Sequence, residues 1–245
     1  MKKALKNLSL KLIPKIVSDF VYSNHPEYKK TRGSNPSFSQ EGEDMLLRKI
    51  FAGQEKGIYV DIGAHHPINF SNTNFFSKKG WAGINVDPLP GSKKTFDLER
   101  VNDTNLELVV SEQEGMVEFY LFDPPLMNTM SKEQAEKNAK FDWCKLQEVK
   151  MIPSLPLHLL LDKYLTPNAQ IDFMSIDVEG AEISVLKSNN WKKYKPNVLL
   201  IEFIDLSIEE IFQTDIHKLL VEHSYKLFAK TWNTVFYKQI GFFEF

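Results

Sequence analysis

Three aspartates each follow a short apolar run, which is where a parallel sheet presents its ligand-binding edge: Asp61, Asp87 and Asp177. Ligands of open α/β sheets bind beyond the carboxyl ends of the strands, so these side chains can reach a bound molecule. Asp61 and Asp87 lie 26 residues apart, about one strand–helix–strand unit. A carboxylate ending the second strand can accept hydrogen bonds from both ribose hydroxyls of an adenosine. We expect Asp61 and Asp87 to hold such a ligand, with Asp87 on the ribose.

The turn after Asp61 contains Gly63, His65 and His66. A glycine at this point lets the backbone pass close to a bound ligand. The full Gly-x-Gly-x-x-Gly fingerprint is missing, which argues against an NAD-dependent oxidoreductase. Adjacent residues of an extended turn point in opposite directions, so the two histidines are not expected to bind one metal together. His66 is a candidate general base, and His65 is a candidate hydrogen-bonding partner of the substrate.

A second acidic group follows the apolar run that ends at Asp177. Asp177 and Glu179 are expected to face the same crevice mouth, since the strand that carries Asp177 should lie beside the strand of Asp61. Both are candidate catalytic residues. With a histidine they could also form an oxygen-and-nitrogen site for a divalent ion. Glu182 lies at the start of the next helix, where an acidic side chain stabilises the helix dipole.

Apolar runs alternate with helical patterns along most of the chain, which predicts a parallel sheet covered on both faces. The expected strands are residues 57–63, 81–87, 106–110, 171–177 and 198–203, and a segment at 117–122 is expected to form a hairpin arm across Gly115. The last two strands, 225–229 and 234–237, are too close for a crossover helix and should be antiparallel. The pattern predicts an α/β Rossmann-like fold with a mostly parallel seven-stranded sheet and a C-terminal antiparallel hairpin. Residues 123–150 are expected to form an irregular lid with a short helix.

Residues 1–38 are expected to form a basic N-terminal arm before a main domain at 39–245. Its apolar residues recur at helical spacing between lysines: Leu5, Leu8, Leu12, Ile16 and Phe20. This predicts a basic amphipathic helix. Residues 1–20 could dock on an anionic membrane surface, or the helix could pack on the main domain or at a subunit interface, a dimer included.

The composition is that of a globular protein. The chain has 245 residues, 42% of them hydrophobic and 25% charged, with a formal net charge of −2. These values exclude disordered and fibrous classes, and they lack the basic excess of a general nucleic-acid binder. The apolar runs are too short for a membrane span, and the single cysteine, Cys144, fits a reduced cytoplasmic setting.

Several motifs in their order along the chain resemble FkbM-type methyltransferases. The segments that carry the resemblance are Asp61-Ile62-Gly63, Asn85-Val86-Asp87-Pro88, residues 110–115, residues 172–182 and Leu200-Ile201-Glu202-Phe203. The resemblance implies a Rossmann-like enzyme that uses S-adenosylmethionine, with Asp61, Gly63, Asp87 and Asp177 at the cofactor. Family members usually carry a second glycine soon after the first, where this chain has His65, His66 and Pro67.

The resemblance also implies an activity and further site residues. It implies an O-methyltransferase whose acceptor is a hydroxyl of a sugar or glycan precursor, with or without a nucleotide, as in bacterial surface polysaccharide synthesis. Ser111 is expected at the adenine edge, Asp177 as the base, and Glu179 and His66 as alternatives to it. His65, Asn72, Asn128 and Thr129 are expected to contact the acceptor. The other functions left open are methylation of a small natural product, methylation of a protein, and a non-catalytic Rossmann-like binding protein.

Overall fold

A computed structural model of the chain describes residues 36–242. The expected amphipathic helix and its membrane contact, in residues 1–20, lie outside the described residues. Residues 38–242 belong to one unit. Among the residues described, no helix has the length and apolar character that crossing a bilayer requires.

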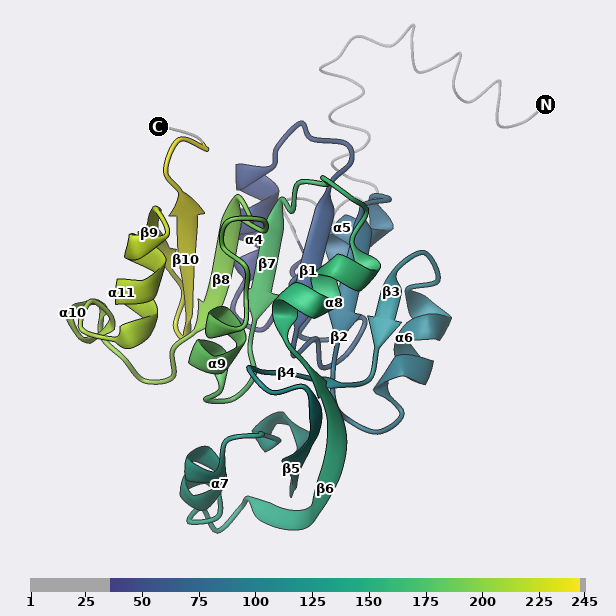
Figure 1. The fold of residues 1–245 in the computed structure, drawn as a ribbon, viewed down its shortest axis with the longest axis vertical. Helices are drawn as coiled ribbons and strands as arrows, with labels where there is room; N and C mark the ends of the chain where they lie inside the picture. Colours follow the sequence, from purple (N-terminus) through teal and green to yellow (C-terminus); the bar gives the residue numbers. More distant parts are fainter. Residues whose placement is uncertain (1–35, 243–245) are drawn as a thin grey trace, which may run out of the picture. The chain divides into compact units, whose positions relative to one another are not determined.

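A seven-stranded sheet forms the centre of this unit, with the order β3-β2-β1-β7-β8-β10-β9 (Figure 1). Its strands are β1 (Ile58–Ile62), β2 (Ala82–Val86), β3 (Thr104–Leu106), β7 (Phe173–Ile176), β8 (Val198–Glu202), β9 (Tyr225–Lys230) and β10 (Thr234–Gln239). The first five run parallel, and β10 pairs antiparallel with both β8 and β9. The predicted fold class is confirmed. Since β2 and β7 flank β1, the strand order reverses at β1, where sheets of this type bind ligands.

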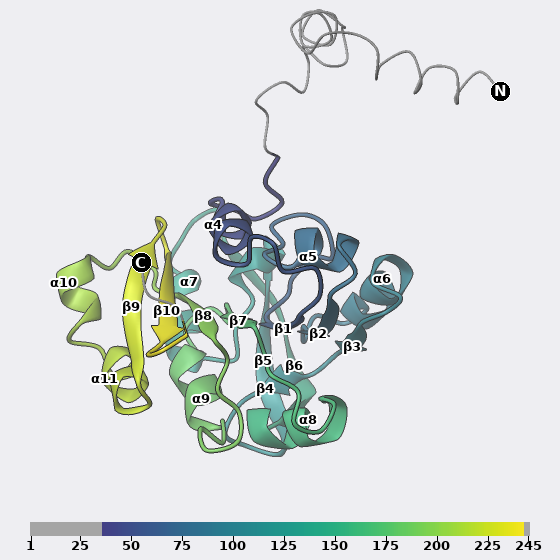
Figure 2. The same ribbon diagram turned by 90° about the horizontal axis from the view of Figure 1, so that it is seen from above.

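Helices cover both faces of the sheet (Figure 2). One face packs against α8 (Leu157–Tyr164), α9 (Glu182–Lys187), α10 (Ile208–Ile211) and α11 (Asp215–Glu222). The other face packs against α4 (Glu43–Ile50) and α5 (Asn74–Lys78) through an aromatic cluster that includes Phe51, Phe76, Trp81 and Phe173. The helix α6 (Ser92–Glu99) connects β2 to β3. This aliphatic and aromatic burial stabilises the layered arrangement, and the carboxyl edge of the sheet stays accessible.

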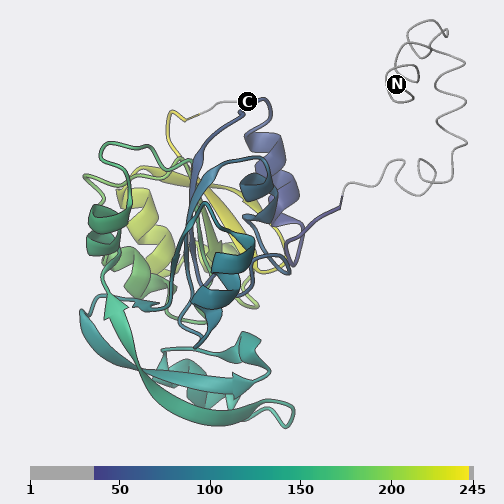
Figure 3. The same cartoon turned by 90° about the vertical axis from the view of Figure 1, so that its right-hand side faces the viewer.

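A smaller β subdomain projects from the carboxyl edge of the main sheet (Figures 1 and 3). Its three strands are ordered β4-β6-β5 and comprise β4 (Val109–Val110), β5 (Gly115–Asp123) and β6 (Lys145–Leu155). Between β5 and β6 lie the 3₁₀ turn η1 (Pro125–Met127) and α7 (Lys132–Asn138). The free thiol of Cys144 is buried there with Phe122 and Ala135.

The structure corrects three sequence predictions in this region. The expected third strand at 106–110 is divided, because Leu106 ends β3 in the main sheet whereas Val109 begins β4 and pairs with Ser154. The expected arm at 117–122 belongs to the longer strand β5, which pairs with β6 and forms no hairpin across Gly115. The segment 123–150 is more regular than expected, since its last residues, from Lys145 on, form the first half of β6.

Candidate active site

The carboxyl ends of β1, β2, β7 and β8 bring together acidic side chains from distant parts of the sequence. Asp61 pairs in register with Asn85 on one side and with Ser175 on the other. Asp87 and Asp177 follow the last residues of β2 and β7, and Glu202 is the last residue of β8. As predicted, the three aspartates lie at the same edge of the sheet.

Asp87 organises the turn that follows β1. Its Oδ2 accepts a hydrogen bond from the backbone N–H of His65 (2.8 Å), and its Oδ1 accepts one from Leu89 N–H (2.8 Å). Burial raises the pKa of this carboxyl to about 7, against the two backbone hydrogen bonds that lower it. His65 lies in the left-handed region at φ 52°. Burial lowers the pKa of its imidazole, with the neighbouring His66 as a smaller cause, so the neutral ring faces the cleft.

Gly63 has no side chain because the backbone of Asp177, just after β7, passes too close to allow one. Its φ is 81°, and a Cβ at this position would lie 1.6 Å from the carbonyl oxygen of Asp177. The two segments are joined here by a hydrogen bond from Asp177 N–H to Ile62 O (3.0 Å). The expectation is a close approach to a bound ligand, whereas the close approach seen at this glycine is to the backbone of Asp177, whose position it helps to set.

A cleft with about 700 Å³ of empty space, partly open to solvent, lies over these strand ends. Main-domain residues Ile62, Val86, Asp87, Leu89, Asp177 and Glu179 line it on one side. The β subdomain supplies the opposite wall, including Phe119, Leu126, Asn128 and Met130. A mostly apolar cleft that also contains a few carboxylates is typical of a small-molecule site.

Asp177, Glu179 and Glu202 form a carboxylate cluster, with one oxygen of each within 4.8 Å of the others. Solvent reaches Asp177 from the cleft, yet crowding by protein atoms and the charge of Glu182 raise the pKa of its carboxyl. Burial and the charge of Asp177 also raise the pKa values of Glu179 and Glu202. The interaction between Glu202 and Asp177 lowers the pKa of Asp177 and raises that of Glu202.

Asp61 is buried beneath this cluster and does not line the cleft. Its Oδ2 accepts a hydrogen bond from the Thr73 hydroxyl (2.9 Å), and burial raises its pKa to about 6. Asn72 donates from Nδ2 to the Ser175 hydroxyl (3.0 Å). These contacts tie the loop before α5 to β1 and β7. Asp61 and Asn72 thereby support the floor of the site.

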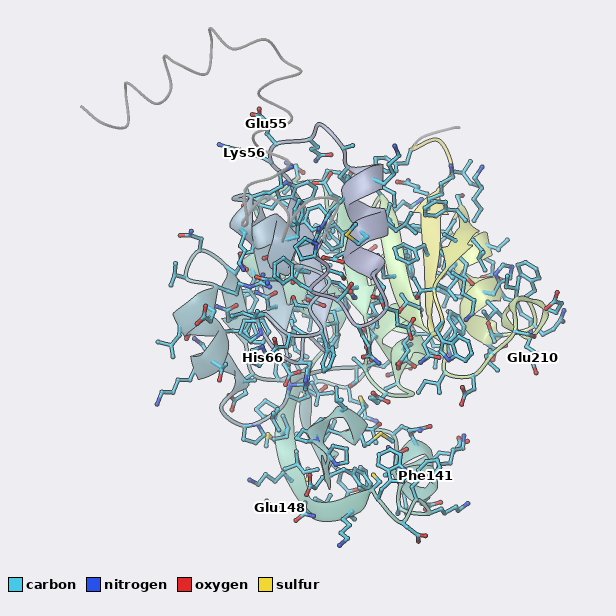
Figure 4. All side chains as sticks on the ribbon, turned by 180° about the vertical axis from the view of Figure 1, so that it is seen from behind. Glu55, Lys56, His66, Phe141, Glu148 and Glu210 are labelled. Carbon is cyan, nitrogen blue, oxygen red and sulfur yellow. The ribbon has the colours of Figure 1, made fainter. Side chains whose placement is uncertain are left out.

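Two candidate residues have their side chains engaged elsewhere. The Nδ1 atom of His66 accepts hydrogen bonds from the backbone N–H groups of Ile68 and Asn69 (both 3.1 Å). Figure 4 labels His66, which does not line the cleft. The hydroxyl of Ser111 is buried 2.8 Å from the Ser154 hydroxyl and does not line the cleft either. The structure does not bring the His66 ring, a candidate base, or the Ser111 hydroxyl, expected at the adenine edge, into the lining of the cleft.

The residues expected in the lid have distinct positions. Asn128 lines the cleft, and its Oδ1 accepts a hydrogen bond from Phe122 N–H (2.6 Å). Thr129 is fully buried and donates from its hydroxyl to the backbone carbonyl of Glu179 (2.7 Å). Glu179 has a strained φ of 52°, so this hydrogen bond helps to hold its left-handed conformation. Glu182 Oε1 accepts from Val178 and Gly180 N–H (both 3.1 Å), as its predicted position at the helix start suggests.

Glu202 and Glu43 are residues that sequence reasoning did not assign to the site. Glu202 carries the same signal as the predicted aspartates, an acidic residue at the end of an apolar strand. Glu43 lies at the start of α4, is buried, and raises the pKa of Asp177 by its charge. Its position is unpredictable from spacing alone, since α4 meets β7 only in the folded chain.

The fold is Rossmann-like with a cleft at the carboxyl edge of its sheet, and comparison of the sequence with protein families identifies the family. The sequence profile described as the methyltransferase FkbM domain matches residues 61–227, so the chain belongs to the FkbM methyltransferase family. No curated protein matches the chain. Among solved structures, the chain resembles a TehB-like SAM-dependent methyltransferase from Corynebacterium glutamicum. The two are 8% identical with a TM-score of 0.41, and the match covers 92% of this chain and 100% of the Corynebacterium chain. Another is a precorrin-6y C5,15-methyltransferase from Geobacter metallireducens, with 10% identity, TM-score 0.39 and coverage of 79% and 84%.

The residues of the cleft fit S-adenosylmethionine, the cofactor of this family. Each Asp87 oxygen accepts one backbone hydrogen bond and has a second lone pair for a ribose hydroxyl. Leu89, Val109 and Val110 offer an apolar wall for an adenine ring. The carboxyl groups of Asp177 and Glu179 also line the cleft, where negative charge favours the cationic sulfonium that S-adenosylhomocysteine lacks.

Proposed function

We propose that the chain is an O-methyltransferase that acts on a hydroxyl of a sugar or glycan precursor. The observation that carries the proposal is the Asp177 carboxylate, which reaches the cleft beside Glu179 and Glu202 and whose pKa is raised toward neutrality. An alcohol must lose its proton as it attacks, so a base of this kind suits a hydroxyl acceptor. S-adenosylmethionine, when bound, supplies the electrophilic methyl group.

The residues of the chain divide the remaining work. Asp87 would hold the ribose hydroxyls, and the apolar walls would exclude water from the reacting atoms. Asp177 accepts the proton of the acceptor hydroxyl, and an oxygen of Glu202 lies within 4.8 Å of its carboxylate. Alignment of the acceptor oxygen with the methyl group can supply roughly 7–11 kcal/mol of the barrier reduction. The chain thus needs a positioned base and a closed cleft.

The test is transfer of an isotope-labelled methyl group to a panel of methyl glycosides, nucleotide sugars and phenolic natural products. We expect a labelled methyl ether on a sugar. Asp177→Asn should keep its affinity for S-adenosylhomocysteine and lose turnover about 100-fold or more. Asp215→Asn is the matched control, since Asp215 is a solvent-exposed aspartate on α11, and should keep full activity. Methylation of phenols alone would favour a natural-product acceptor, and near-normal turnover of Asp177→Asn would remove it as the base.

The carboxylate cluster also has the oxygen donors that a divalent cation prefers. Proton transfer and metal binding predict different responses to a chelator. If the cluster is the base, treatment with EDTA leaves both S-adenosylhomocysteine affinity and turnover unchanged. Loss of turnover that added Mg²⁺ restores would assign the cluster to a metal.

The setting and the acceptor class are part of the same proposal. The buried thiol of Cys144 supports a reducing, cytoplasmic location. The net charge of −2 supports a small-molecule acceptor over a nucleic acid.

A further inference from the structure

The turn between β9 and β10 presents an exposed tryptophan on a fixed backbone. Trp232 is 78% exposed, the highest value among the large apolar side chains of the described residues. The residues on either side of it are both held by Glu41, whose Oε2 accepts hydrogen bonds from the Thr231 hydroxyl (2.7 Å) and from Asn233 N–H (2.8 Å). Phe203 N–H also donates to the Asn233 carbonyl (2.8 Å). The backbone that carries the indole is therefore fixed from two directions.

This turn lies at the same sheet edge as the carboxylate cluster. Thr234, the first residue of β10, pairs in register with Glu202, the last residue of β8. The Thr234 hydroxyl donates to Glu43 Oε1 (3.0 Å), and the charge of Glu43 acts on Asp177. Since β8 lies on the side of β7 away from β1 and β2, the turn that carries Trp232 lies beyond Glu202, on the side away from Asp87 and outside the lining of the cleft. That side is the one left for an acceptor when the cofactor lies over β1 and β2.

An exposed indole beside several carboxylates is a chemical combination that suits an uncharged sugar ring. Carboxylate oxygens accept hydrogen bonds from vicinal hydroxyls, and the indole face packs against the apolar C–H face of a pyranose. Glu41 and Glu43 place negative charge at this end, which disfavours a phosphate close to the ring. Lys230, the nearest cation in the sequence, donates to the carbonyl oxygens of Thr231 and Trp232.

We infer that Trp232 is the stacking platform for the ring of an uncharged sugar acceptor at the carboxylate end of the cleft. The inference rests on the proposed function and narrows it, because it favours a neutral glycoside over a nucleoside diphosphate sugar. Stacking on the indole orients the sugar ring, and it requires no charged group on the acceptor. The acceptor hydroxyl can then approach Asp177 while its neighbours bond to Glu179 or Glu202.

The experiment compares Trp232→Ala and Trp232→Phe with Trp143→Ala in the full chain, using uncharged methyl glycosides and nucleotide sugars as acceptors. Trp143 is the matched control, because it is 60% exposed on the β subdomain and stacks on Phe141. We expect Trp232→Ala to raise the acceptor KM about tenfold and Trp232→Phe, which keeps an aromatic face, to raise it only about threefold or less. Affinity for S-adenosylhomocysteine should be equal in all variants and in the wild type.

Each other outcome overturns a different part of the account. An unchanged acceptor KM in Trp232→Ala removes the platform, and an increased KM in Trp143→Ala moves the acceptor to the β subdomain. A lower KM for nucleotide sugars than for neutral glycosides overturns the uncharged acceptor. Binding of S-adenosylhomocysteine without methylation of any glycoside overturns the sugar assignment, whereas failure of the wild type to bind it overturns the proposed function itself.

Discussion

Replacement of Gly63 by alanine probes the contact that positions Asp177, the proposed base. The added Cβ would lie 1.6 Å from the Asp177 carbonyl oxygen, whereas real Cβ contacts are essentially never below 3.0 Å. The ends of β1 and β7 must therefore separate by about 1.4 Å. That movement strains the hydrogen bond from Asp177 N–H to Ile62 O and displaces the Asp177 side chain from the cleft.

The expected size of the effect follows from these contacts. The left-handed φ of 81° costs alanine roughly 1–2 kcal/mol. Weakening of the strand-end hydrogen bond adds on the order of 1 kcal/mol. A total of about 2–3 kcal/mol corresponds to a decrease in Tm of roughly 4–12 °C for a domain of this size. Misplacement of the base by about 1 Å should lower kcat about 100-fold.

Gly53→Ala is the matched control, because Gly53 has a φ of 88° and nothing within 4 Å of its Cβ position. It carries the same backbone penalty without the collision, so its Tm should fall by about half as much and its kcat should stay near the wild-type value. Thermal unfolding, calorimetric titration of S-adenosylhomocysteine and methyl transfer would be measured for both variants. Equal Tm and equal kcat in the two variants would refute the role of the Gly63–Asp177 contact.

Two further predictions concern the electrostatics and the lid of the site. Burial raises the pKa of Asp87 from 3.8 to about 7, so its contribution to stability is fully present below pH 3.8 and is lost as the pH rises through about 7. Affinity for S-adenosylhomocysteine should rise over the same range, with proton release detectable by calorimetry in buffers of different ionisation enthalpy; a flat pH profile would contradict the ribose role. Thr129→Val removes the buried hydrogen bond to Glu179 O and should cost roughly 1–3 kcal/mol of unfolding free energy and lower kcat. An unchanged Tm and kcat in this variant would show that Thr129 does not hold the Glu179 turn.

The fold was predictable where local sequence signals agree with the final packing. The strands β1, β2, β7 and β8 are apolar runs that end in acidic or turn residues, so both their existence and the edge they share follow from the sequence. The strand β6 was not predictable, because most of its residues are exposed and lack an alternating apolar pattern. Its pairing with β5 is a long-range contact that no local signal specifies.

The site was predictable in its residue types and less so in its contacts. Asp87, Asp177 and Glu179 reach the cleft as the strand-end pattern suggests. Whether His66 is available depends on the backbone N–H groups of its own turn, which hold its Nδ1 atom in the folded chain. Glu202 completes the cluster only because β8 lies next to β7, a fact of strand order that spacing does not contain.

The central claim is that Asp87 holds the cofactor and Asp177 acts on the acceptor, and one titration series tests it most directly. S-adenosylhomocysteine would be titrated by calorimetry into the wild-type chain, Asp87→Ala and Asp177→Asn. The account predicts micromolar binding by the wild type, loss of binding by Asp87→Ala and wild-type affinity for Asp177→Asn. Unchanged affinity in Asp87→Ala, or no binding by the wild type, would contradict it.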